Sequence, residues 1–445
     1  MEVPRQPAAM GYPPARQAWY SVGVLSVAYV FSFIDRQILS LLVVPIRRDL
    51  QISDTQMSLL MGLSFALFYT VFGFPIGWMA DSRSRRNIIT AGVFTWSLFT
   101  AACGLTGSFF QLFLARMGVG AGEAALSPPA YSLIADCFPP KQRPLALSVY
   151  GAGMYVGAGL ALVLGGIIVP YTLAGGTITL PLIGLVIYRW QLTFFLVGLP
   201  GLLVAALVHT VREPARREKQ AAAGAPVGAV VAYVIKHRAT FACHHVATAL
   251  ISFAMYGSSA WVPSSLVRTY GWSIGTAGLA FGSVVTIFCT LGILAGGWYC
   301  AFLTRRGYRD AHFRVGLTVT LLQLPLVVLL PFMPTGGLAI VLLVPICFLG
   351  ASMFGVAPAA LQQVVPNEMR AQVSAMYLFV INIIGLGAGP TVVALLTDRY
   401  FHDDTMLRYS LMIACTGAYL LSALLWRVGL GPFRRTVEQT EALRA

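Results

Sequence analysis

The stretch Gly77-Trp78-Met79-Ala80-Asp81-Ser82-Arg83-Ser84-Arg85-Arg86 is a short basic segment between two long apolar runs, at 55–80 and 87–107. An apolar run of about 20 residues is long enough to cross a hydrocarbon core of roughly 30 Å as a helix. Short loops rich in Arg are typical of the cytoplasmic side of a membrane. The stretch therefore predicts two transmembrane helices joined by a tight cytoplasmic turn.

The same pattern of apolar runs and short polar breaks extends over the whole chain. Of its 445 residues, 57% are apolar and 10% are charged, whereas soluble domains carry about 25% charged residues. Hydropathy predicts an all-α membrane protein with twelve spans. The spans are expected at 17–45, 55–80, 87–107, 109–137, 143–172, 189–211, 241–270, 274–304, 311–332, 336–366, 370–400 and 405–430.

The basic residues predict the orientation of these spans. With the N-terminus inside, 22 of the 30 Lys and Arg residues fall in cytoplasmic segments and six on the opposite side, so both termini are expected in the cytoplasm. We expect a tail at 1–16, a six-helix bundle at 17–211, a linker at 212–240, a second bundle at 241–430 and a tail at 431–445. A bacterial inner (plasma) membrane is the expected location.

The net charge of +14 does not indicate a nucleic-acid partner, because the basic residues are spread over these loops. The seven cysteines stand singly in or beside apolar runs without metal-ligand spacing. We therefore expect no metal and no cofactor.

The two halves resemble each other. Gly77-Trp78 with its following arginines has a counterpart 220 residues later in Gly297-Trp298, which Arg305 and Arg306 follow. A parallel six-helix repeat with a binding site between the halves at mid-membrane is a known plan of transporters.

The 77–86 stretch resembles the signature loop of the major facilitator superfamily. The resemblance implies a fold of two pseudo-symmetric six-helix bundles and a gating motif that contains Gly77, Asp81, Arg83, Arg85 and Arg86. In that motif Asp81 is expected against a helix N-terminus or a basic partner, and the arginines against cytoplasmic carboxylates and lipid phosphates. The alternative is that the arginines only enforce topology.

Three further stretches resemble the Spinster family within that superfamily: Phe33-Ile34-Asp35-Arg36, the run 116–124, which begins with Arg116 and contains Glu123, and the run 131–136. This resemblance implies transport of lysolipids or sphingolipid-like amphiphiles, coupled to protons in some members. The expected partners are such an amphiphile, protons and membrane lipid, and a monomer is expected.

Four ionisable residues lie deep in the predicted spans: Asp35, Arg36, Arg116 and Glu123. Charges persist in a membrane when they are paired or line a wet cavity. At 1.5 Å per residue, Asp35 and Arg36 lie between Arg116 and Glu123 in depth, so the four can form one neutral cluster. A permanent salt-bridge network that only joins two helices is the structural alternative.

The functional hypothesis gives each charge a role. Asp35 and Glu123 are candidate proton acceptors, and Arg36, Arg116 and Glu123 are candidate substrate-binding residues, since arginine offers a planar fork to phosphate or carboxylate. Arg36 is expected to keep Asp35 ionised, and Glu123 is expected to pair with Arg116.

The second half contributes no clear carboxylate within its spans. Tyr256 and Asn382 are expected to line its side of the cavity, together with Trp261 and Gln362. A further acidic group, Asp398, Asp403 and Asp404, is expected in a solvated outer loop. A cavity charged on one side and apolar on the other suits an amphiphile.

The sequence thus predicts a secondary active transporter that works by alternating access on a lysolipid or sphingolipid-like substrate, with protons as the coupling ion. The alternative substrates are small organic anions or drugs. A lipid-modifying enzyme is not expected, because the chain shows no His, Cys, Asp and Glu set with the spacing of a catalytic or metal site.

Overall fold

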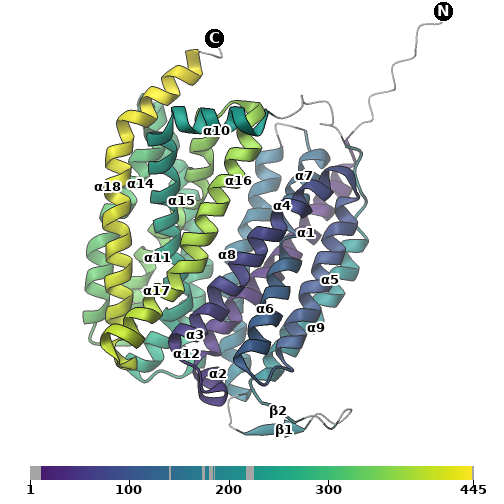
Figure 1. Cartoon of the computed structure of the whole chain (residues 1–445), viewed down its shortest axis with the longest axis vertical. Helices are drawn as coiled ribbons and strands as arrows, with labels where there is room; N and C mark the ends of the chain where they lie inside the picture. The colour runs from purple at the N-terminus through teal and green to yellow at the C-terminus, as the bar shows by residue number, and fades with distance from the viewer. Residues whose placement is uncertain are drawn as a thin grey trace, which may run out of the picture.

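The computed structural model describes residues 12–139, 142–172, 176–179, 184, 186–216 and 225–442. It is built almost entirely of long helices that run roughly side by side, and both ends of the chain lie at the same end of the molecule (Figure 1). That end carries α10 (Val227–Lys236), and the opposite end carries a small hairpin of β1 (Thr177–Thr179) and β2 (Val186–Tyr188).

Each half of the chain supplies one group of helices. The first half contains α1 (Ala15–Ile38), α2 (Val43–Leu50), α3 (Asp54–Ser58), α4 (Ser64–Ser82), α5 (Arg85–Cys103), α6 (Phe109–Glu123), α7 (Ser127–Cys137), α8 (Arg143–Thr172) and α9 (Gln191–His209). The second half contains α11 (Arg238–Tyr270), α12 (Ile274–Val284), α13 (Thr290–Arg305), α14 (Ala311–Leu329), α15 (Gly336–Val364), α16 (Arg370–Val380), α17 (Gly389–Leu395) and α18 (Leu407–Ala442).

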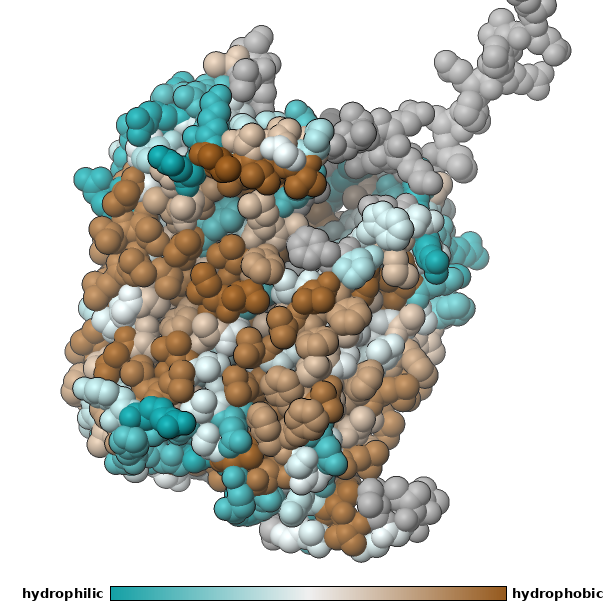
Figure 2. Space-filling view, in the orientation of Figure 1, coloured by the Kyte–Doolittle hydropathy of each residue, from teal (hydrophilic) through white to brown (hydrophobic). Residues whose placement is uncertain are grey.

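The helices match the predicted spans. Among the described residues, ten helical segments are long and apolar enough to cross a membrane. Shorter or more polar helices, α5 and the pair α6 and α7, occupy the predicted third and fourth spans and complete the set of twelve. Figure 2 shows an apolar band across the middle of the visible face and hydrophilic residues at its two ends, as a membrane protein requires.

The fourth predicted span is not one continuous helix. The regular α-helix is interrupted at 124–126 by a tighter turn, in which Ala125 donates to the carbonyl of Gly122 and Leu126 to that of Glu123. The first turn of α7 carries prolines. Pro128 and Pro129 lack the backbone N–H that a continuous helix needs, and their rings clash with preceding carbonyls. The break leaves Glu123 as the last residue of α6.

Two other helix boundaries differ from the expected ones. The helix α18 continues to Ala442, past residue 430 at which the sequence predicted the last span to end. The region 212–240 contains α10, which packs against the second half: Gln372 Nε2 donates to the carbonyl of Ala225 just before it.

The two halves meet closely where α8 crosses α12. A Cβ on Gly278 would lie 2.6 Å from the carbonyl oxygen of Leu162, and one on Gly166 would lie 2.9 Å from that of Gly275. Small residues let membrane helices approach to this distance. Gly166 of the predicted fifth span and Gly278 of the eighth therefore allow close packing near the outer ends of α8 and α12.

Candidate functional site

The four buried charges gather between α1 and α6. Asp35, Arg116 and Glu123 are at most 2% exposed, and only the side chain of Arg36, 14% exposed, retains some accessible surface. Arg116 and Glu123 lie seven residues apart on α6, and therefore on one face two turns apart, opposite the end of α1. The sequence prediction of one compact charge cluster is confirmed by this geometry.

The pairing within the cluster differs from the expected one. Arg36 Nε lies 2.6 Å from Glu123 Oε2, and Arg116 Nη1 lies 3.3 Å from Asp35 Oδ1. Adjacent residues of a helix point about 100° apart, so Asp35 and Arg36 do not pair with each other, and each meets a different residue of α6. Arg116 and Glu123 are about 10 Å apart along their helix, so they do not pair either.

Hydroxyl groups complete the two ion pairs. Ser32 donates to Glu123 Oε2 at 2.5 Å, and Thr100 of α5 donates a short hydrogen bond to Asp35. Glu123 Oε1 and the Nε and Nη2 atoms of Arg116 have no hydrogen-bond partner among the described residues. The cluster is neutral overall, yet it keeps free donors and acceptors in the interior.

Aromatic rings surround the Arg36 guanidinium. Its central carbon lies 4.7 Å from the ring centre of Phe33, 4.4 Å from that of Phe65 and 4.9 Å from that of Tyr69. Ring faces attract cations at these distances. The sequence did not indicate Phe65 and Tyr69, because they come from α4 and carry no motif of their own.

Arg36 lines the central cavity between the two halves, which encloses about 1090 Å³ of space between atoms, counting the part open to solvent. Of the residues predicted to bind substrate, the cavity wall includes Arg36 and Tyr256. Arg116 and Glu123 lie behind that wall, and Asn382 is not part of it. Trp261 is buried and donates to the carbonyl of Pro390, and Gln362 is exposed outside the cavity.

Most of the remaining wall is apolar or carries neutral polar groups. Its residues include Phe33, Gln37, Ser40, Met61, Phe65, Met154, Tyr155, Met255, Ser259, Phe281, Val285, Cys289, Gln323, Leu343, Ile346, Cys347 and Tyr419. At one end of the cavity Gln37 and Ser259 join the halves through two hydrogen bonds of 2.8 Å. Neither residue was indicated by the sequence, since each belongs to an apolar span.

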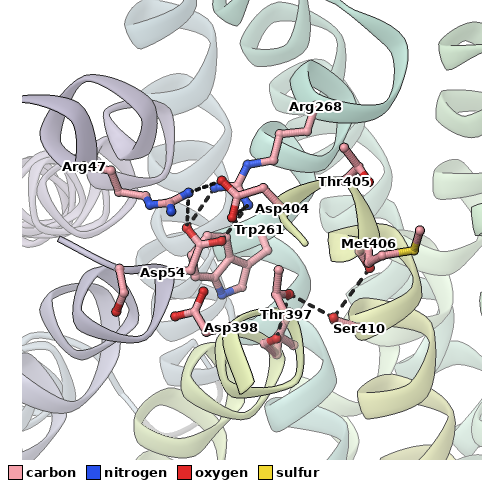
Figure 3. A network of polar contacts seen from close by, with 12 residues as sticks. Arg47, Asp54, Trp261, Arg268, Thr397, Asp398, Asp404, Thr405, Met406 and Ser410 are labelled. Carbon is pink, nitrogen blue, oxygen red and sulfur yellow. Dashed lines mark hydrogen bonds and ion pairs between the residues drawn. The ribbon is translucent and has the colours of Figure 1, made fainter. Parts of the chain in front are cut away.

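A network of ion pairs closes the outer side of the molecule (Figure 3). Arg268, in the last turn of α11, contacts both oxygens of Asp54 at 2.5 and 2.8 Å. Arg47 of α2 lies 3.0 Å from Asp54 and 2.6 Å from Asp404. Asp54, in the first turn of α3, is fully buried. The two arginines thus tie the first half to the second.

The expectation of a solvated outer loop is wrong for Asp398, which is half-buried, whereas Asp404 is exposed as expected and also pairs with Arg47. Asp398 accepts hydrogen bonds from the backbone N–H and the hydroxyl of Thr55, at 2.6 and 2.7 Å. Carboxylate oxygens of Asp54, Asp398 and Asp404 come within 4.8 Å of one another, and the arginines between them offset their repulsion. Asp403 is exposed and only caps Thr405.

The basic loop 77–86 forms a second network at the opposite end. Arg85 is fully buried, lies 2.5 Å from Asp136 and 2.8 Å from Glu213, and donates to Ser132. Arg85 thus meets cytoplasmic carboxylates, as expected for a latch, and these belong to the first half (Asp136) and to the linker that follows it (Glu213). Arg83 is exposed and Arg86 is half-buried. The side chain of Asp81 lies outside the described residues.

Glu213 is the carboxylate in this network whose protonation is expected to change the stability of the protein measurably. Burial alone would raise the pKa of Glu213, but hydrogen bonds from the Arg86 backbone, from Arg85 and from Ser84 lower it below its ordinary value. A lowered carboxyl pKa stabilises the folded state at pH values above the unfolded pKa, and this contribution is lost as the pH falls through the folded pKa.

We therefore expect Glu213→Gln to lower the thermal stability of the purified protein at pH 7, by about 1–3 kcal/mol, because a charge-assisted hydrogen bond to buried Arg85 is lost. The difference from the unmodified protein should shrink as the pH falls below about 4.5, the ordinary carboxyl pKa, and through the lower pKa of Glu213 in the folded state. Melting temperatures at one scan rate across this range measure both effects. Glu438→Gln, an exposed change, is the control. A difference that does not vary with pH would contradict the assignment.

Comparisons with known proteins place this chain in a family. The Major Facilitator Superfamily model matches residues 25–390. An "MFS-type efflux pump" of Mycolicibacterium smegmatis is 30% identical over 427 residues, 95% of each chain. The "Sphingosine-1-phosphate transporter SPNS2" of Danio rerio is 26% identical over 303 residues, 62% of this chain and 55% of that one.

The likeness to a solved structure agrees. A bacterial homolog of the human lysosomal transporter Spinster, in an inward-facing and unoccupied conformation, superimposes with a TM-score of 0.76 at 24% identity, over 97% of this chain and 99% of that one. The fold expected from the Spinster resemblance is confirmed. The chain belongs to the major facilitator superfamily and is a multi-pass membrane transporter.

Proposed function

We propose that this transporter moves a lysolipid or sphingolipid-like amphiphile with an anionic head group, by alternating access and together with protons. The observation that carries the proposal is the cavity wall, where Arg36 is the charged group and most of the surrounding surface is apolar. A guanidinium suits a phosphate or carboxylate head, and the apolar wall suits a hydrocarbon tail. The relative named as a sphingosine-1-phosphate transporter supports this substrate class.

The outer network supports alternating access. Ion pairs that join the two halves at one end of the cavity hold that end shut, and they must break when the opposite conformation forms. Tight packing of α8 against α12 closes the same side. The described conformation therefore corresponds to a state closed on the outer side.

Proton coupling follows from the connection between Arg36 and Glu123. In the described state the Arg36 guanidinium neutralises Glu123 and also faces the cavity. A substrate anion that attracts Arg36 would leave Glu123 as an unpaired buried carboxylate, which is costly unless it takes up a proton. Binding of the anion and uptake of the proton would then favour each other.

Asp35 is the second proposed proton acceptor. Its distance of 3.3 Å from Arg116 exceeds the 2.7–2.9 Å that is typical of strong charge-assisted hydrogen bonds. We expect Asp35→Asn to reduce uptake driven by a pH gradient at least tenfold, while substrate exchange without a gradient continues. Proteoliposomes measure both modes. Equal loss of both modes would indicate a structural role for Asp35 instead.

Efflux of other organic anions or drugs is the second candidate, favoured by the 30% identity to an efflux pump over nearly the full chain. Uptake into proteoliposomes with an imposed pH gradient separates the two. A lysophospholipid should compete for transport far better than the same phosphorylated head group without its acyl chain. Equal competition by the tail-less compound would support the organic-anion alternative and contradict the amphiphile proposal.

A further inference from the structure

A second large hollow lies on the lipid-facing side of the first half, away from the central cavity. It is a groove between α4, α5 and α6 that encloses about 1470 Å³, counting its open side. Exposed Phe72, Phe99 and Leu114 line it, and the small residues Gly118 and Ala121 belong to its α6 wall. A surface that is hollow, apolar and exposed in the membrane will be filled by hydrocarbon.

The groove has the length of one lipid leaflet. Along α4 its apolar lining runs from Phe68 to Met79, which is 11 residues or about 16 Å. Half of a hydrocarbon core of roughly 30 Å is about 15 Å. An acyl chain of the cytoplasmic leaflet can therefore lie in the groove with its head group at the Arg83 end.

The cytoplasmic end of the groove is polar and positively charged. Arg83 and Asn87 line it and are exposed. Asn87 Oδ1 accepts a hydrogen bond from Arg86, which leaves its NH₂ group as a donor. The carboxylates Asp136 and Glu213 at this end pair with the buried Arg85.

The internal repeat places a related feature in the second half. A smaller hollow of about 740 Å³ is lined by Gly297, Thr304, Arg305 and Gly355, again with an arginine among its residues. Trp78 and Trp298, which occupy matching positions in the two halves, are 75% and 64% exposed. Trp side chains prefer the head-group level of a bilayer, which places both hollows at the same interface.

We propose that the groove between α4, α5 and α6 binds an anionic phospholipid of the cytoplasmic leaflet, with its phosphate at Arg83 and Asn87 and an acyl chain along the helices. Charge complementarity selects this occupant over a zwitterionic lipid, because a basic residue at the membrane surface favours anionic lipids about fivefold. The site is separate from the transport cavity and does not depend on the identity of the transported substrate.

Trp78 reports on this site, since it adjoins Met79, which lines the groove. The protein is reconstituted into phosphatidylcholine vesicles that contain either brominated phosphatidylglycerol or brominated phosphatidylcholine. Subtraction of the Trp78→Phe signal isolates the quenching of Trp78. We expect the brominated anionic lipid to reach half-maximal quenching at about one fifth of the mole fraction of the zwitterionic one.

Two variants test the two parts of the site. Arg83→Gln should abolish the anionic preference, and Ala121→Phe, which fills the groove, should reduce quenching by both lipids. Ala206→Phe, an exposed position of α9 outside the groove, is the matched control and should change neither. Equal quenching by both lipids, or a preference that survives Arg83→Gln, overturns the proposal. If Trp78 is quenched less as the density of protein in the vesicles rises, a second copy of the chain covers the groove and the lipid proposal is wrong.

Discussion

Replacing Arg36 by Ala is expected to abolish net transport, with a loss of uptake of about 100-fold or more. The change removes the cationic group that the cavity wall presents to an anionic head, and hydrogen bonds to charged groups contribute about 1.5–3 kcal/mol each. The same change leaves Glu123, which is 1% exposed, without its partner at 2.6 Å. Initial uptake rates in proteoliposomes at equal protein density measure the effect.

Loss of stability must be separated from loss of function, because breaking a buried ion pair costs about 3–5 kcal/mol. The double variant Arg36→Ala with Glu123→Gln removes the unpaired charge and should recover much of the lost melting temperature. Transport should stay absent, since the head-group contact is still missing. Arg399→Ala, at an exposed outer position, is the control. Recovery of transport in the double variant would show that Arg36 serves only to neutralise Glu123.

Membrane spans and orientation were predictable from the sequence because they depend on local composition. Any helix that crosses lipid must be apolar over about 20 residues, and this requirement acts on each segment independently. The break at 124–126 was missed although Pro128 and Pro129 indicate it, since prolines are common in membrane helices whose neighbours satisfy the freed backbone groups.

The charge cluster was predictable in its members but not in its pairs. Buried Asp35, Arg36, Arg116 and Glu123 must neutralise each other somewhere in the interior, and depth along the two helices brings them together. Which carboxylate meets which arginine depends on how α1 is rotated against α6. That rotation is set by the packing of neighbouring helices such as α4 and α5, which no pattern within these two segments encodes.

The outer network was missed for a different reason. Arg47 and Asp54 lie more than 200 residues from Arg268 and about 350 from Asp404, and each stands at a helix end where an exposed charge is ordinary. Nothing local distinguishes a solvated outer aspartate from one that joins the two halves. The network becomes visible only when the ends of α2, α3 and α11 and the 398–404 segment are seen together (Figure 3).

The outer network leads to the second large expected effect. Arg268→Ala should shift the protein from the outside-closed conformation towards the outside-open one, because the bidentate contact with Asp54 exists only where the halves meet. Without Arg268, Asp54 still pairs with Arg47 at 3.0 Å. The outside-closed conformation therefore loses about 2 kcal/mol, which is less than the cost of leaving a buried carboxylate with no partner. A change of 2 kcal/mol alters the ratio of the two conformations about 30-fold.

Spin labels on the outer ends of the two halves measure this ratio. Leu105, beyond the end of α5, and Phe332, beyond the end of α14, are exposed and can be replaced by labelled cysteines in a background without the native ones. In Arg268→Ala the distance distribution should gain a longer component. Arg48→Ala is the matched control, since Arg48 lies on the same outer side but pairs with its neighbour Asp49 within one half. An unchanged distribution in Arg268→Ala would mean that helix packing, above all the contact of α8 with α12, closes the outer side without help from the ion pairs.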